Sequence, residues 1–80
     1  MKSPFFRLER IKTSALMFSK TKEHIMTQVG INSKITGFNF SMDYVRQYQF
    51  VDLIGTLRIN KYKGFTNLEF LVNDLIESLN

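Results

Sequence analysis

Residues 50–64, FVDLIGTLRINKYKG, carry a guanidinium, an amide and an aromatic ring at alternate positions. Alternate side chains of a β-strand share a face, so this stretch predicts a strand with one apolar and one polar face. The apolar face consists of Val51, Leu53, Leu57 and Ile59. The polar face consists of Asp52, Thr56, Arg58, Asn60 and Tyr62. One polar face is typical of an antiparallel sheet, and here it is the first candidate for a binding surface.

Further basic residues could extend this surface. They are Lys20, Lys22, Lys34, Lys61 and Lys63. With Arg58 they would form a basic track if the loops that carry them open on one side of a barrel. The alternative is a set of solubilising surface lysines. Tyr62 and Phe65 could offer ring faces for base stacking, although Phe65 could equally fill the bottom of a barrel.

Catalytic chemistry within this chain has few candidate groups. His24 is the only histidine, and there is no cysteine with which it could share a metal. We therefore favour a contact or structural role for His24 over a catalytic one. The acidic residues show no spacing typical of a general acid and base pair. The sequence predicts no enzyme activity, no metal site and no cofactor for this chain.

The 80 residues leave room for one domain, residues 1–80, with a small core. Because there is no cysteine, no disulfide framework can form, and a cytoplasmic location is the default expectation. No apolar run is long enough for a membrane span, and the N-terminus lacks the pattern of a signal peptide. A net charge of +4 and a pI near 9.6 permit binding to polyanions such as nucleic acid.

Five strands are expected along the chain. The first covers residues 5–18 with a bulge near residues 12–14, and the second, residues 24–29, follows a charged loop. The third, residues 34–40, forms a hairpin with the second and contains a bulge at Gly37. A short helix within residues 41–49, capped by Ser41 or Asp43, leads to the strand at residues 50–64.

The fifth strand covers residues 67–73, and a helical turn at residues 75–79 is expected to cover an open end of the fold or another domain. The phenylalanines assigned to the core are Phe38, Phe40, Phe50 and Phe70. Three strands, a helical connection and two strands are the element order of the OB-fold, a five-stranded Greek-key barrel. The predicted fold class is therefore an all-β, OB-fold-like barrel, and an SH3-like barrel is the nearest alternative.

Four pieces of the chain carry a resemblance to a known family. They are KTKEHI at residues 20–25, ITGFNF at 35–40, VDLIGTLRINKYKG at 51–64 and LEFLVNDL at 68–75. In this order they resemble the C-terminal OB-type domain of RecJ, a bacterial 5′ to 3′ exonuclease specific for single-stranded DNA. The aromatic residue after the asparagine is usually tryptophan in that family and is Tyr62 here.

The resemblance implies that this chain is a fragment of a larger exonuclease. The catalytic core of the family holds divalent metal with Asp-His-His motifs, which this chain lacks. The implied function is to bind single-stranded DNA and guide it to catalytic domains of the same polypeptide. The implied contacts are the basic residues above with His24, Asn60 and Tyr62. A structural or protein-interaction module is the second hypothesis, and a self-contained small nuclease is the third.

Overall fold

The computed structural model describes residues 4–79 and contains five strands, one short α-helix and one 3-10 turn. The elements are β1 (Phe6–Lys12), η1 (Thr13–Ala15), β2 (Ile25–Val29), β3 (Ser33–Gly37), α1 (Met42–Arg46), β4 (Phe50–Tyr62) and β5 (Phe65–Glu77). The expected order of three strands, a helical connection and two strands is confirmed. In residues 4–79 no helix has the length and apolar character needed to cross a membrane.

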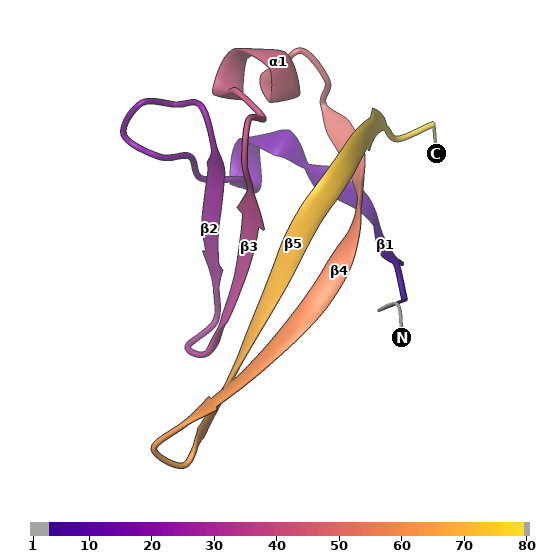
Figure 1. Ribbon diagram of the computed structural model, residues 1–80. Helices are drawn as coiled ribbons and strands as arrows, with labels where there is room; N and C mark the ends of the chain where they lie inside the picture. Colours follow the sequence, from indigo (N-terminus) through magenta and orange to yellow (C-terminus); the bar gives the residue numbers. More distant parts are fainter. Residues whose placement is uncertain (1–3, 80) are drawn as a thin grey trace.

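The strands form one curved mixed sheet in the order β1-β4-β5-β3-β2. β3 and β5 are parallel, and the other neighbouring pairs are antiparallel. Helix α1 and η1 lie at one end of the sheet, and the long hairpin of β4 and β5 extends to the opposite end (Figure 1). We call these the helical end and the hairpin end.

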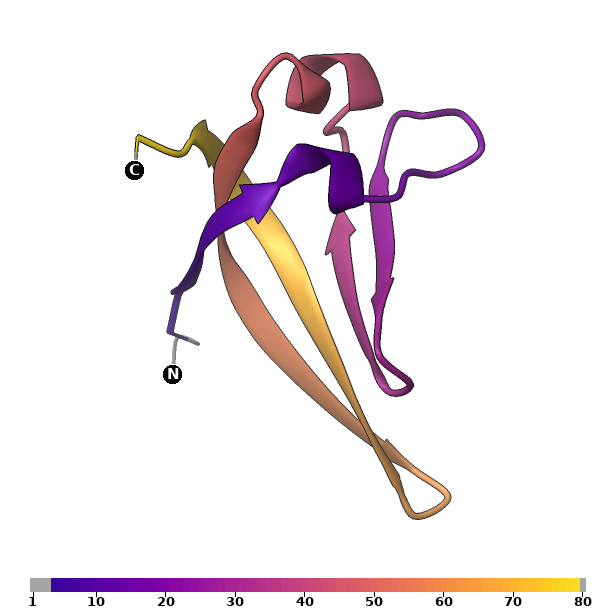
Figure 2. The same ribbon diagram turned by 180° about the vertical axis from the view of Figure 1, so that it is seen from behind.

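The sheet is not closed into a barrel, so this part of the predicted fold class is wrong. β1 ends at Lys12, where η1 interrupts the long first strand that was expected for residues 5–18. After η1 the chain meets β2 only briefly, through a bridge between Phe18 and Ile25 and a hydrogen bond from Met26 N to Met17 O of 2.9 Å. Figure 2 shows β1 leading into η1 below α1, and β1 and β2 are the two edge strands of the sheet.

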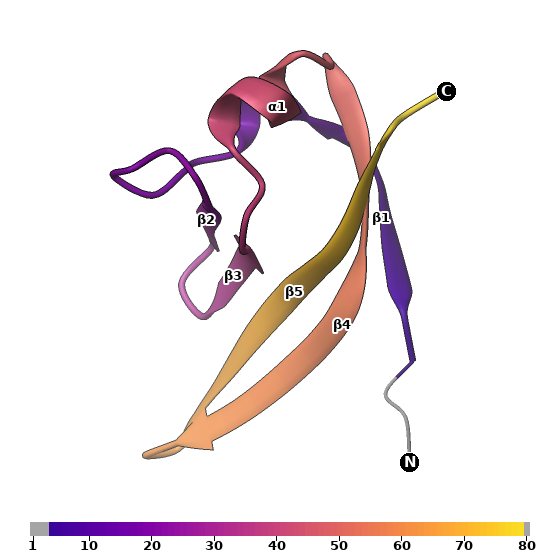
Figure 3. The ribbon, with the colours of Figure 1, turned by 45° about the horizontal axis from the view of Figure 1, so that its top comes forward.

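The core lies between the sheet and the helical end. Its buried apolar residues are Leu16, Ile25, Ile35, Val45, Val51, Leu53, Phe70, Val72 and Leu75. Helix α1 contributes Val45, which is 0% exposed, and covers this end of the sheet (Figure 3). Ser41 caps the helix by accepting a hydrogen bond from Tyr44 N at 3.2 Å, as predicted. The rings of Tyr44 and Tyr48 pack edge to face, with centroids 6.2 Å apart.

Asp52 is buried, although it was predicted to lie on the polar face. Its carboxylate accepts hydrogen bonds from Arg10 N at 2.8 Å and from the Arg7 guanidinium at 2.6 Å. Arg10 has a φ of 54° within a bulge between Leu8 and Ile11, which turns its N–H toward Asp52. A buried carboxylate needs such partners, so Asp52 fixes the bulge of β1 against β4.

The apolar face of β4 is covered along only half of its length. Val51 and Leu53 are fully buried, whereas Leu57 is 41% exposed and Ile59 is 60% exposed. β1 begins opposite Gly55, so beyond that point β4 pairs only with β5 among residues 4–79. The prediction that Leu57 and Ile59 lie in the core is therefore wrong.

Three further predictions are also wrong. Phe38 was assigned to the core, but it lies in the turn after β3 and is 61% exposed. Residues 75–77 were expected in a helical turn, but they continue strand β5 against β4. Gly37 lies in an unbroken β2–β3 ladder and not in a bulge, and a Cβ there would press on Ile25, Phe40 and Val72.

Candidate nucleic-acid interface

A two-residue turn sets the register of the long hairpin and therefore its surface. Lys63 and Gly64 have φ values of 49° and 80°, and Tyr62 lies directly opposite Phe65. Two successive residues with positive φ are typical of a type I′ turn, whose twist matches that of the flanking strands. This turn fixes the register of the cross-strand pairs from Tyr62–Phe65 as far as Gly55–Val72.

Three successive pairs of side chains lie on the outer face of this hairpin, which is the face opposite the core. Starting from the turn they are Tyr62 with Phe65, Asn60 with Asn67, and Arg58 with Glu69. Neighbouring pairs are two residues apart, which is about 7 Å along a strand. The outer face thus offers an aromatic pair, an amide pair and an ion pair in a row. We call these six residues the hairpin ladder.

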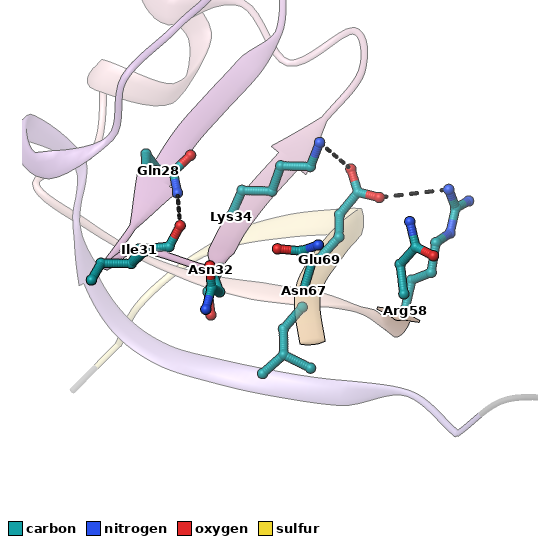
Figure 4. Close-up of a pocket in the computed structure, with 10 residues that line it drawn as sticks. Gln28, Ile31, Asn32, Lys34, Arg58, Asn67 and Glu69 are labelled. Atoms are coloured by element: carbon teal, nitrogen blue, oxygen red, sulfur yellow. Dashed lines mark hydrogen bonds and ion pairs between the residues drawn. The ribbon is translucent and has the colours of Figure 1, made fainter. Parts of the chain in front are cut away.

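On the outer face, the polar side chains of the hairpin ladder are continued across the sheet by residues of β3 and β2. Lys34 is the partner of Glu69 across the parallel pair, and Gln28 is the partner of Lys34. Together with Asn32 and the amide pair these residues line a shallow pocket of about 470 Å³ (Figure 4). The Gln28 side-chain amide donates to the carbonyl oxygens of Gly30 and Ile31, which holds the β2–β3 turn at the rim of the pocket.

Glu69 is the central charge of the pocket. Its Oε2 lies 3.7 Å from Lys34 Nζ, and its Oε1 lies 3.5 Å from an Arg58 guanidinium nitrogen (Figure 4). Thr36 Oγ1 donates a hydrogen bond of 2.9 Å to the same carboxylate. The Glu69 side chain is 17% exposed, against 57% for Lys34 and 65% for Arg58. The two cations therefore reach into solvent from a shared, partly buried carboxylate.

The aromatic pair at the turn is almost free of contacts with the rest of the domain. Tyr62 is 64% exposed and Phe65 is 63% exposed. Lys63 Nζ lies 5.4 Å from the centroid of the Tyr62 ring, within cation–π range. Lys61 is paired with Thr66 and lies on the opposite face, which it shares with Ile59. The tip therefore combines two ring faces with two flexible ammonium groups.

Three other candidate residues lie at the helical end, in the loop between η1 and β2. Lys20 and Lys22 are exposed there, and Lys22 O accepts a hydrogen bond from Met42 N at 2.8 Å. His24 Nδ1 accepts a hydrogen bond from Asn39 N at 2.9 Å, and its ring packs edge to face on Phe38 at 5.6 Å. His24 therefore joins its loop to the turn after β3, which is one of its two expected roles.

The nine candidate residues form two groups and not one continuous track. Six of them lie at or near the hairpin end, namely Lys34, Arg58, Asn60, Lys61, Tyr62 and Lys63. Lys20, Lys22 and His24 lie at the helical end (Figure 1). The two groups are separate because the loop before β2 lies at the helical end of the sheet, whereas the turn after β4 lies at the hairpin end.

The site also contains residues that the sequence reading did not select, chiefly Asn67 and Glu69. Both could have been found by folding residues 50–77 about the Lys-Gly turn, which brings Asn67 opposite Asn60 and Glu69 opposite Arg58. No three histidine, aspartate or glutamate side chains are grouped to hold a metal ion within residues 4–79.

Comparisons with protein-family models, with curated proteins and with solved structures found no match to this chain. The similarity to the exonuclease domain therefore rests on the four sequence pieces alone.

Proposed function

We propose that this chain is an OB-type module that binds single-stranded DNA as an accessory domain of a RecJ-like exonuclease. It would guide the strand to a metal-dependent catalytic core outside this chain. The observation that carries the proposal is the row of aromatic, amide and cationic side chains on one outer face. Single-strand binders combine these same groups, with rings that stack on bases and cations that follow the phosphates.

The order of the strands supports an OB-type fold for this module. In an OB barrel β1 pairs with β4, β3 runs parallel to β5, and a loop joins β1 to β2. All three features occur here, and the bridge from Phe18 to Ile25 lies where the barrel would close. OB-folds are partly open barrels that bind oligonucleotides on the face of strands 2 and 3 and through the loops between strands 1 and 2 and strands 4 and 5.

Both groups of candidate residues fall on this expected path. Lys34 lies on β3, and Arg58, Tyr62 and Lys63 lie next to the loop between β4 and β5. Lys20 belongs to the loop that precedes β2. A single strand that crossed the outer face of β2 and β3 would meet one group at each end of its path.

Fluorescence anisotropy of a labelled oligothymidylate tests the proposal directly. We expect binding that weakens as salt is raised, with log K falling by about 0.7 per log unit of salt for each phosphate contacted. The double variant Lys61→Gln, Lys63→Gln should weaken binding. The matched control Arg10→Gln, Lys12→Gln removes the same charge from the edge strand β1 and should bind nearly as well as wild type. No salt-dependent binding at high micromolar protein would refute a DNA-contact role.

A protein-interaction module is the second candidate, because part of the inner face of the sheet is apolar and uncovered. Val29 is 46% exposed, and with Leu57, Leu68 and Phe70 it lines an apolar hollow of about 200 Å³ beside Ile59. In this case Ile59→Ser should abolish the function of the parent protein while Lys61→Gln, Lys63→Gln leaves it intact. The opposite pattern supports DNA binding.

A self-contained nuclease predicts metal-dependent cleavage of single-stranded DNA by the purified chain. We expect no cleavage, because the reaction needs a cluster of metal ligands that we assign to the upstream catalytic core. Incubating the chain with a labelled oligonucleotide and Mg²⁺ or Mn²⁺ tests this, and any product that disappears on chelation would favour the nuclease.

A further inference from the structure

Glu69 holds the position that a phosphate group would need in the proposed interface. Its carboxylate lies between Lys34 and Arg58, the two cations at the base of the hairpin ladder. Both ion pairs are longer than a direct hydrogen bond, at 3.7 Å and 3.5 Å, whereas the bond from Thr36 is 2.9 Å. The carboxylate is thus held by Thr36, and the two exposed cations are free to move away from it.

We propose that Glu69 is an internal counter-ion that competes with a nucleic-acid phosphate for Lys34 and Arg58. This inference rests on the proposed function, and it assigns the pocket to one phosphodiester of a bound single strand. When the phosphate enters, Lys34 Nζ and the Arg58 guanidinium turn to its oxygens, and Glu69 stays bonded to Thr36. Repulsion between the carboxylate and the phosphate limits the affinity of the site.

Exposed ion pairs of this kind are weak, which makes the exchange possible. Each contributes little to stability in solution, because water screens it and because two long side chains lose freedom when they form it. Glu69 itself is only 17% exposed, so it has less freedom to leave than either cation. The partly buried Glu69 carboxylate thus lowers the net charge of the two mobile cations from +2 to +1 until a phosphate arrives.

The variant Glu69→Gln tests the competition with little change of shape. The glutamine carbonyl oxygen can still accept the hydrogen bond from Thr36, but the negative charge is gone. We expect Glu69→Gln to bind oligothymidylate about 3- to 10-fold more tightly than wild type at low salt. We also expect a steeper salt dependence, by up to about 0.7 in the slope, because the two cations that meet the phosphate are no longer offset by a carboxylate.

Asp74→Asn is the matched control, because it removes the same charge from the same face of the same strand. Asp74 makes no ion pair within residues 4–79, and its Oδ1 accepts a hydrogen bond from Leu75 N that asparagine can keep. If only the net charge matters, both variants will bind equally tightly and the inference is wrong. If Glu69 instead orients the two cations for DNA, Glu69→Gln will bind more weakly than wild type, which also overturns it.

The same titrations separate failure of this inference from failure of the proposed function. Wild type, Glu69→Gln and Asp74→Asn are compared by anisotropy, and thermal melting checks that all three are folded. If none of them binds the oligonucleotide, the proposed DNA-binding function is wrong. If all bind with the same affinity and salt dependence, DNA binding stands and the role of Glu69 is refuted.

Discussion

The two halves of β4 have the same alternating pattern of residues but lie in opposite environments. In the first half Val51, Asp52 and Leu53 are all buried, with at most 1% exposure. In the second half Leu57, Ile59 and Tyr62 are between 41% and 64% exposed. The difference lies in the neighbours, because β1 and the helical end cover only the first half. Alternation therefore predicts which side chains share a face, but coverage decides which of them are buried.

Under the proposed function, this division separates stability from binding along a single strand. The buried half holds the core and the Asp52 contacts that join β1 to β4. The exposed half carries the hairpin ladder, with its aromatic, amide and ionic pairs. Substitutions in the first half should therefore unfold the domain, and substitutions in the second half should change what it binds.

The sharpest test compares two apolar residues on the same face of β4. Leu53→Ala removes a fully buried side chain and should lower the free energy of unfolding by about 2–5 kcal/mol. Ile59→Ala trims a side chain that is 60% exposed and should cost less than about 1 kcal/mol. Urea denaturation followed by circular dichroism measures both. Equal losses in the free energy of unfolding would mean that the second half of β4 is covered in solution.

Two glycines of the same hairpin should respond differently to substitution. A Cβ at Gly55 would overlap the Leu71 carbonyl, so Gly55→Ala should destabilise the domain by about 1–3 kcal/mol. Gly64 has open space around it but a φ of 80°. Gly64→Asn should be nearly neutral, because asparagine tolerates the left-handed region. Thermal melting of both variants measures the contrast, and a tolerated Gly55→Ala would contradict the close approach of β4 and β5.

The buried carboxylate of Asp52 should make the stability depend on acid pH. The hydrogen bond from Arg10 N lowers its pKa, the Arg7 guanidinium lowers it further, and burial opposes both. A carboxylate with a lowered pKa contributes stability above its ordinary pKa near 4, and this contribution is lost as the pH falls through the lowered value.

Asp52→Asn should therefore melt at a lower temperature than wild type at neutral pH. The difference in melting temperature between the two proteins should narrow as the pH is lowered from about 5, because the wild type then loses the negative charge that the variant already lacks. Added salt should change the neutral-pH melting temperature of wild type little, since the Asp52 carboxylate and its hydrogen bond from Arg10 N are buried and poorly screened, although the Arg7 side chain is 52% exposed. A constant gap at all pH values would show that the charge of Asp52 is not what stabilises the bulge.

Short-range signals made much of this fold predictable from the sequence. The strand–helix–strand order followed from alternation and turn residues, and Ser41 was one of the two residues, with Asp43, that were predicted as the helix cap. The β2–β3 hairpin followed in the same way. Each of these signals lies within a few residues of the structure that it specifies.

Features that depend on distant residues were not predictable. Asp52 is buried because Arg7, 45 residues away, and the β1 bulge satisfy its carboxylate. The end of β5 was mistaken for a helical turn because Leu75 is out of phase with Val72. A register shift opposite residues 54 and 55 restores the phase, and nothing local in the sequence marks it.

The candidate site was also predictable only in part: residues on one strand were found, but contacts between distant strands were not. Arg58, Asn60 and Tyr62 were found from alternation along one strand. The contact of Glu69 with Lys34 depends on the parallel register of β3 and β5, which links segments that lie far apart in the sequence. The two groups of lysines are separate because the loop before β2 and the turn after β4 lie at opposite ends of the sheet (Figure 1), and composition does not reveal this.

The smallest effect on stability is expected at the tip of the hairpin. Tyr62 and Phe65 are exposed and cover nothing, so Tyr62→Ala, Phe65→Ala should change the free energy of unfolding by less than about 0.5 kcal/mol. The same double variant should lose about 1–3 kcal/mol of binding free energy for each base that stacks on a ring. Tyr62→Phe keeps the ring face and should bind like wild type. If Tyr62→Phe binds as weakly as Tyr62→Ala, the hydroxyl group and not the ring makes the contact, and the hairpin tip is not a stacking surface.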